Sequence, residues 1–439
     1  MKLDRSSAAA LLLSLTVGLL CAFPAQKNKN SQQAPPPRTE PRADPLEAWL
    51  AQAEEALGKK DFAGAIEALQ KYIERKPEDA LAHFQLGFAY TGLKQWESAK
   101  AEYSKAIELD SKLAAAHLNL GLLLLERDPS AALPPLSKAA ELLPDQARPR
   151  LLLGTALERS HRLEAALEQY QAAQRLEPNN QEIHFALARA LLASKRPAEA
   201  ETEWNKVLEL RPNSTGARLG LAESLIAQSK FEAAASALAA YLELQPQDQE
   251  SRIQLASVYL DLERFDQALR ELERAEKVGP TSLAVQKLRA EIYLHQKRFP
   301  EAAEALQQAL ALEPSNAELR ARLGRLWLEK REFAAAEREL RHALRMNPNL
   351  TDALRDLVAV YYLGQNCPAA LETLSLLAQR EAPTAGSWFV RATCHDKLGM
   401  KAEALAAYER FLVLDRGENA QQNFQARQRI RILTRELKK

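Results

Sequence analysis

Three histidines are the residues of this chain whose spacing could serve chemistry, because imidazole is a common ligand for metals. His83 and His117 lie 34 residues apart, and His184 takes the same place in the pattern two units later. Metal ligands must converge on one point, whereas equivalent positions in a stacked repeat stay a helix pair apart. We therefore expect these histidines to pack between helices, with no metal and no cofactor bound.

No catalytic motif accompanies the histidines. The sequence has no Gly-rich phosphate loop, no His-Glu-x-x-His zinc pair and no Gly-x-Ser-x-Gly elbow. Carboxylate pairs on helix faces arise by chance at this abundance of Glu, and they are usually surface salt bridges. With 59 Lys and Arg against 58 Asp and Glu, no charge excess indicates nucleic acid or an anionic membrane surface. We predict a protein that is not an enzyme and has no catalytic residues.

The first 45 residues differ from the rest. Lys2 and Arg5 precede an apolar run, residues 8–23, which is short for a transmembrane helix and typical of a secretory signal. We predict a signal peptide over residues 1–25 and a periplasmic or secreted protein. A retained anchor, or a lipid on Cys21, is the alternative that would bring membrane contact. Residues 26–45 are polar and rich in Pro, and they predict a disordered spacer.

The remainder repeats every 34 residues. Prolines recur at this interval near the end of each period, and each follows a helix that it cannot continue: Pro178, Pro212, Pro246, Pro280, Pro314 and Pro348. Within one period, Gly87 and Tyr90 share one helical stripe, and Ala99, Tyr103 and Ala106 form a second. Each period therefore predicts a helical hairpin whose apolar face is buried only when the next hairpin stacks on it.

This pattern resembles the tetratricopeptide repeat, in which small residues stand at the eighth and twentieth positions and Pro at the thirty-second. The resemblance implies an all-α, right-handed superhelical solenoid over residues 46–418 and a C-terminal capping helix over residues 419–439. The N-terminal signal further suggests an exported bacterial member of the family. About eleven units begin near Leu46, Ala80, Ala114, Ala147, Gln181, Thr215, Gln249, Leu283, Ala317, Thr351 and Ala385.

The third unit departs from the pattern. It is one residue short, and it carries Pro134 and Pro135 inside its expected second helix. Two missing backbone donors predict that this helix is kinked there or begins late.

By the same resemblance, certain positions of each first helix line the inner groove of the superhelix. Large apolar residues hold these positions in the N-terminal seven units, and an apolar groove of this kind suits an extended or helical peptide. The alternative is that neighbouring helices bury these side chains within the core. The candidate groove residues are Leu50, Phe84, Phe88, Leu118, Leu122, Leu151, Phe185, Leu219 and Ile253.

Two cysteines remain once the signal is removed. Cys367 begins the second helix of one unit, and Cys394 lies in the first helix of the next. These helices run antiparallel and both cysteines fall on facing stripes, so we predict a disulfide in an oxidising compartment. The alternative is two free buried thiols.

The function that follows is a non-catalytic scaffold of the cell envelope. Its partners would be other proteins or peptides, held in the groove of the solenoid, and not nucleic acid. The alternative is an accessory or regulatory subunit of an envelope enzyme or of an export or assembly complex.

Overall fold

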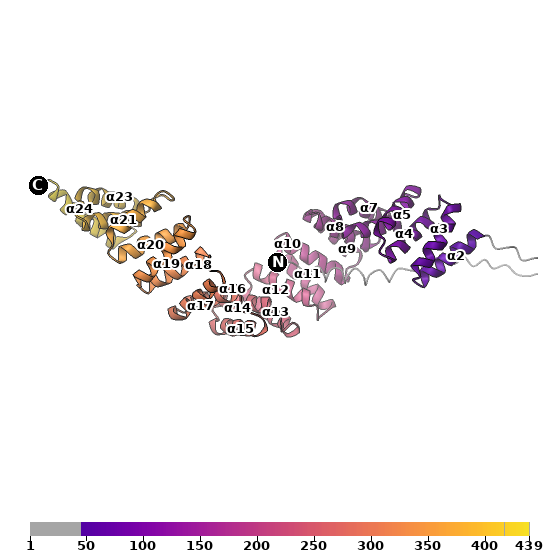
Figure 1. Ribbon diagram of the computed structural model, residues 1–439, viewed down its shortest axis with the longest axis horizontal. Coiled ribbons are helices and arrows are strands. Elements are labelled where there is room, and N and C mark those ends of the chain that lie inside the picture. The colour runs from indigo at the N-terminus through magenta and orange to yellow at the C-terminus, as the bar shows by residue number, and fades with distance from the viewer. Residues whose placement is uncertain (1–44, 417, 439) are drawn as a thin grey trace, which may run out of the picture. The chain divides into compact units, whose positions relative to one another are not determined.

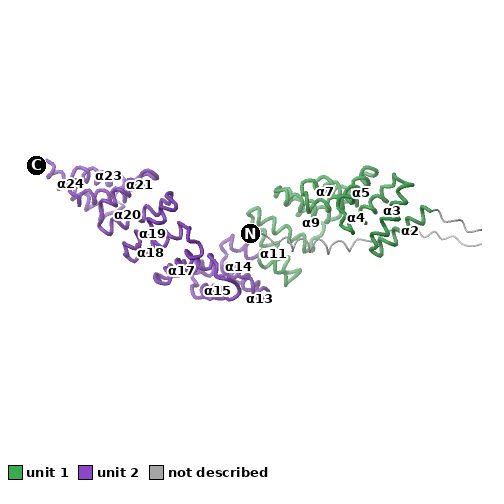
Figure 2. Tube along the Cα trace, in the orientation of Figure 1, with its two compact units in different colours: residues 1–220 green, residues 221–439 purple. Residues whose placement is uncertain are grey.

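The computed structural model describes residues 45–416 and 418–438, and these residues form 23 helices and no strands. They divide into two compact units, residues 1–220 and 221–439, shown in two colours in Figure 2. The predicted signal peptide and nearly all of the predicted spacer lie outside the described residues. The spacer's last residue, Pro45, is the first residue of a helix.

In the first unit the helices follow one another in chain order, as Figure 1 shows. They are α2 (Pro45–Gly58), α3 (Phe62–Arg75), α4 (Ala80–Gly92), α5 (Trp96–Leu109), α6 (Ala114–Leu125), α7 (Pro129–Leu142), α8 (Ala147–Arg159), α9 (Leu163–Leu176), α10 (Gln181–Ala193) and α11 (Pro197–Leu210). The boundary between the units falls inside α12 (Thr215–Ala227).

The second unit continues the same alternation of helices. It contains α13 (Phe231–Leu244), α14 (Gln249–Asp261), α15 (Phe265–Val278), α16 (Leu283–His295), α17 (Phe299–Leu312), α18 (Ala317–Glu329), α19 (Phe333–Met346), α20 (Thr351–Leu363), α21 (Cys367–Leu377), α22 (Ala385–Lys397), α23 (Lys401–Asp415) and α24 (Ala420–Glu436).

Within each compact unit, the first helix of a hairpin packs on the second helix of the same hairpin. That second helix in turn packs on the first helix of the following hairpin. From α4 onward, every predicted first residue of a repeat is the first residue of the corresponding helix, and α2 begins one residue before Leu46. The predicted all-α solenoid of helical hairpins is therefore confirmed.

A small residue facing a large one holds each hairpin together. A Cβ atom added at Gly87 would lie 2.7 Å from the ring of Tyr103, and one added at Gly154 would lie 2.6 Å from the ring of Tyr170. Both tyrosine side chains are fully buried. Other units have Ala at this position, as with the fully buried Ala256 in one cluster with Leu272 and the fully buried Ala392 in one cluster with Tyr408. The close approach of the two helices thus explains the small residue at the eighth position.

The turn between the two helices of a unit is built from backbone hydrogen bonds. In the repeat that begins at Ala80, Gln95 N–H donates to the carbonyl of Tyr90 at 2.9 Å, and Lys94 has a φ of 58°. This left-handed residue ends the helix as in a Schellman motif. In the described residues, nine such turns use a residue other than Gly: Lys60, Lys94, His161, Lys195, Ser229, Glu263, Lys297, Arg331 and Gln365.

The expectation of a delayed helix in the third unit is wrong, since α7 begins at Pro129 and continues through Pro134 and Pro135. Asp128 accepts a hydrogen bond from Ala131 N–H at 3.0 Å, which fixes the start of the helix. The two prolines deprive the carbonyls of Ser130 and Ala131 of donors. Both of these residues are exposed, so water can bond those carbonyls at little cost.

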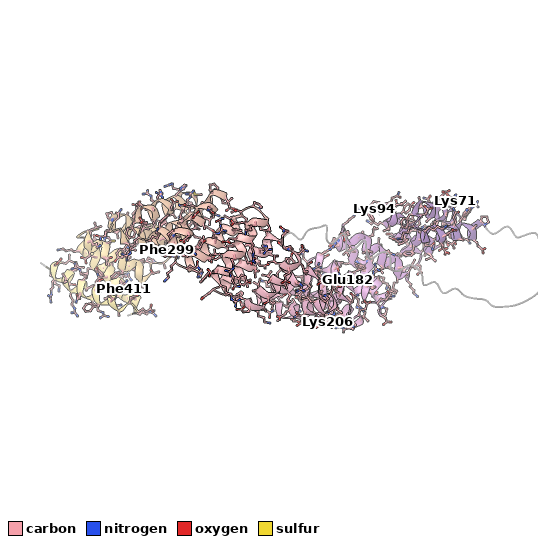
Figure 3. The ribbon with its side chains drawn as sticks, turned by 90° about the horizontal axis from the view of Figure 1, so that it is seen from below. Lys71, Lys94, Glu182, Lys206, Phe299 and Phe411 are labelled. Atoms are coloured by element: carbon pink, nitrogen blue, oxygen red, sulfur yellow. The ribbon has the colours of Figure 1, made fainter. Side chains whose placement is uncertain are left out.

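The last helix, α24, packs on α23. Phe411, labelled in Figure 3, is fully buried in one cluster with Ala426 and Leu433 of α24. Over the described part of the chain, no helix combines the length and the apolar character needed to cross a bilayer.

Candidate functional site

The nine candidate groove residues are neither buried nor freely exposed. Each side chain is half-buried, from Leu50 on α2 to Ile253 on α14. Eight of the nine belong to the first compact unit, and Ile253 belongs to the second. The structure therefore places one partly accessible apolar side chain at an equivalent point on each of seven successive first helices.

The aromatic members of this set pack against rings of neighbouring helices. The centroid of the Phe84 ring lies 5.9 Å from that of Tyr103, and the centroid of the Phe88 ring lies 6.2 Å from that of Phe62. Phe185 meets Trp204 edge to face at 4.9 Å. The outer part of each ring is left to solvent, so these residues support the hairpins and also form part of their surface.

A recurrent polar contact lies one residue before these apolar positions, at the fourth position of the unit. His83 donates from Nδ1 to Glu102 Oε2 at 2.6 Å, and its Nε2 contacts the carbonyl oxygen of Pro77 at 3.1 Å. His184 repeats this arrangement with Glu203 at 2.5 Å and Pro178 at 2.9 Å. We call this arrangement the position-four clip: a side chain that bonds the carbonyl six residues before it and a glutamate nineteen residues after it.

Arginine forms the same clip in later repeats. Arg252 donates from Nη1 to Glu271 Oε2 at 3.1 Å and from Nη2 to the carbonyl of Pro246 at 2.8 Å. Arg320 likewise bonds Glu339 at 3.2 Å and the carbonyl of Pro314 at 3.2 Å. The histidines therefore connect helices within a repeat.

His117 shows what the clip requires. Its Nε2 contacts the carbonyl of Ser111 at 3.1 Å, but Leu136 stands where the glutamate would be. The Nδ1 atom of His117 is buried without a hydrogen-bond partner. The glutamate at the nineteenth residue was the signal that could have revealed the clip from the sequence.

Replacing Glu271 with alanine is expected to destabilise α14 and α15 by about 3 kcal/mol, because it leaves the buried guanidinium of Arg252 without its carboxylate. Glu271→Gln should cost less, because an amide oxygen still accepts a hydrogen bond. Hydrogen exchange of the amides in α14 and α15 would measure both losses. Equal losses for the two variants would show that the charge of Glu271 contributes nothing.

Charged groups on neighbouring first helices pair in both compact units. Arg189 Nη2 donates to Glu158 Oε2 at 2.8 Å in the first unit, and Arg325 Nε donates to Asp356 Oδ2 at 2.8 Å in the second. In the second, burial raises the pKa of Glu223, and the nearby carboxylate of Glu250 raises it further. Asp261 lies in a similar setting, where burial and then Glu291 raise its pKa. The first helices of the second unit therefore also carry neighbouring carboxylates whose mutual repulsion a bound cation would reduce.

A cavity of about 350 Å³ lies among α9, α10 and α11. Its lining is largely polar and includes Gln174, Arg175 and Glu203. Gln174 Nε2 donates to Glu203 Oε2 at 2.9 Å, and Glu203 also holds His184. Two polar groups of this lining, Gln174 and Glu203, are therefore bonded to each other.

Comparison with protein families decides what the repeat is. Tetratricopeptide repeat models match residues 90–127, 151–215, 204–249, 253–317 and 293–359, which together cover more than half of the chain. The chain belongs to the tetratricopeptide repeat family.

Solved tetratricopeptide repeat structures resemble parts of the chain. MamA from Desulfovibrio magneticus RS-1 is 24% identical over 39% of this chain and 98% of its own, with a TM-score of 0.38. PilF of Pseudomonas aeruginosa is 27% identical over 50% and 99%, with a TM-score of 0.39. YrrB, described as a TPR protein with an unusual peptide-binding site, is 23% identical over 53% and 100%, with a TM-score of 0.33. No curated protein matches the chain significantly.

The two cysteines of this tetratricopeptide repeat solenoid meet in one hydrophobic cluster. Cys367 is the first residue of α21, Cys394 lies in α22, and both are buried. The structure holds them as free thiols. Burial, followed by the adjacent Cys367 thiol, raises the pKa of Cys394 to about 12. The predicted disulfide stays a prediction, and the two residues it needs lie against each other.

No group of three or more His, Cys, Asp or Glu residues in the described part of the repeats is arranged to hold a metal ion. His83 and His184 are bonded within their own hairpins and to the loop before them, whereas the imidazole of His117 is bonded to the loop before it through Nε2.

Proposed function

We propose that this protein is a non-catalytic interaction scaffold of the cell envelope, which binds partner peptides or proteins along its first helices. Membership of the tetratricopeptide repeat family supports a role in protein interaction. The observation that carries the proposal is the half-buried apolar side chain at the same point of seven successive first helices. A partner presenting apolar side chains at intervals would cover these points and gain their burial.

The choice of the cell envelope rests on the N-terminal sequence, where Lys2 and Arg5 precede an apolar run of residues 8–23. The mass of the protein purified from its native host would test this part of the proposal. Loss of the first residues supports export by signal cleavage. An intact N-terminus would contradict cleavage and leave an anchor.

The binding surface can be tested with the full chain as bait in a peptide-display selection. Leu118→Arg with Leu122→Arg would place two cations on the candidate surface of α6. This pair is preferable to changes at Phe84 and Phe88, whose rings pack on Tyr103 and Phe62. We expect the affinity of the selected peptides to fall at least about tenfold, since two buried apolar contacts become charged.

A matched control changes two leucines that lie at the ends of second helices. Leu176 and Leu210 are exposed by 36% and 38%, and their replacement by Arg alters charge and apolar area to the same extent. The control should bind the selected peptides as the parent does, and circular dichroism should show both variants folded. Peptides that bind both variants alike would exclude the first helices as the binding surface.

A further inference from the structure

The final helix, α24, carries a basic face that no acidic side chain neutralises. Arg427, Arg431 and Arg435 of α24 are all exposed, as is Lys438 just past the end of the helix. The spacing of four residues places the three arginines along one side of the helix, over roughly 12 Å. None of the four forms an ion pair with another residue in the described part of the chain. In a chain whose total charge is only +1, this face is an unusual concentration of positive charge.

Two large apolar side chains share this outward face. Phe424 is exposed by 64% and Ile432 by 40%. Both are separated by helical spacing from the residues that bury α24, which are Ala426 and Leu433. The exposed face therefore combines cations with an aromatic and an aliphatic side chain.

The opposite side of α24 is firmly held. Arg429 donates from Nε and Nη2 to the two carboxylate oxygens of Asp396, each at 2.6 Å. Lys401 of α23 pairs with Glu436 at 2.9 Å. The helix consequently cannot rotate to bury Phe424 without breaking these contacts. Its basic face therefore stays exposed to solvent.

We propose that the outward face of α24 binds anionic lipid headgroups at a membrane surface. Cations attract such headgroups, while Phe424 and Ile432 can enter the boundary between headgroups and acyl chains. An acidic peptide would need a groove or a strand edge to hold it. The outward side of a single helix is convex. The cavity at α9–α11 and the smaller cavity at α21–α22 are both lined by residues of other helices, and α24 contributes to neither. A single-stranded nucleic acid could pair with the cations and stack a base on Phe424, but the aliphatic Ile432 offers a base no aromatic ring to stack on.

The test is sedimentation of the full chain with vesicles of phosphatidylcholine, alone or with one quarter phosphatidylglycerol. We expect preference for the anionic vesicles, weakened by salt. Replacing Arg427, Arg431 and Arg435 together by Gln should lower the partition coefficient about 100-fold, since each cation near such a surface contributes roughly fivefold. Phe424→Ser should lower it about tenfold, through the lost apolar area.

A matched variant separates this face from charge in general. Arg270, Lys277 and Arg322 are exposed cations on α15 and α18, and their joint replacement by Gln removes the same charge. This variant should bind anionic vesicles as the parent does. Any contribution of residues 1–44 is common to all variants, so it cancels in the comparison.

Equal sedimentation with neutral and anionic vesicles would overturn the proposal. So would undiminished binding by the α24 triple variant when circular dichroism shows it folded. If that variant lost binding to a mixed-sequence RNA while the parent showed no vesicle preference, the face would belong to nucleic acid instead. The proposal is independent of the first-helix binding surface, whose test uses other residues and peptides.

Discussion

Replacement of Tyr103 by alanine is expected to destabilise the repeats around α4 and α5 by about 3–5 kcal/mol. The Tyr103 side chain is 1% exposed, and its hydroxyl lies 3.1 Å from Thr91 Oγ1. Its removal would leave a cavity against Gly87, which has no side chain with which to fill it. Because a solenoid does not unfold in one step, hydrogen exchange of amides in α4 and α5 is the appropriate measurement.

The companion experiment exchanges one complementary pair for another that the chain already uses. Gly87→Ala alone should cost about 1–3 kcal/mol, since the new Cβ would lie 2.7 Å from the Tyr103 ring. Gly87→Ala with Tyr103→Leu recreates the pair formed by Ala256 and Leu272. The double variant should therefore lose less stability than the sum of its single changes. A Gly87→Ala protein as stable as the parent would show that the Tyr103 ring does not limit this position.

Oxidation of Cys367 and Cys394 to a disulfide is expected to stabilise the last two repeats by about 3.5 kcal/mol, the chain-entropy estimate for a loop of this length. Refolding with oxidised glutathione supplies the oxidant. The two thiols lose their hydrogens, one sulfur–sulfur bond forms, and glutathione leaves as two thiols. The protein mass should fall by about 2 Da, and reduction should restore it.

Cys394→Ser provides the control for this measurement. It keeps a small side chain in the cluster but cannot form the bond, so oxidant should change neither its mass nor its stability. A parent protein whose mass is unchanged after refolding in oxidant would contradict the disulfide. In that case the buried thiols act only as small apolar residues of the cluster.

The sequence was sufficient to place the hairpins because the signals involved are local and repeated. Small residues such as Gly87 and the prolines recur every 34 residues, and their spacing marked the helix starts that the structure shows. Of the two alternatives for α7, a kink or a late start, the late start is wrong because the effect of Pro134 depends on solvent. The carbonyl that loses its donor belongs to exposed Ser130, a property that no local pattern contains.

The candidate surface was harder to predict for a related reason. An apolar side chain at the fifth position fits a groove and a core equally well, and only the neighbouring rings decide how much of it is covered. Phe84 and Phe185 are partly covered by Tyr103 and Trp204. The position-four clip was missed because its two ends, such as His83 and Glu102, lie nineteen residues apart on different helices.

The left-handed turn residues lower the stability of the solenoid, because this conformation is unfavourable for every residue except glycine. Each L-residue in that conformation costs roughly 1–2 kcal/mol, and nine turns in the described repeats contain one. Their sum is comparable to the whole net stability of an ordinary domain, about 5–15 kcal/mol. Lys, His, Ser, Glu, Arg and Gln all occupy this place, so the hydrogen-bonded frame imposes the conformation on whichever residue mutation supplies. The turns are thus sites where sequence can drift freely while the backbone stays constant, and where a change to glycine would release strain one repeat at a time.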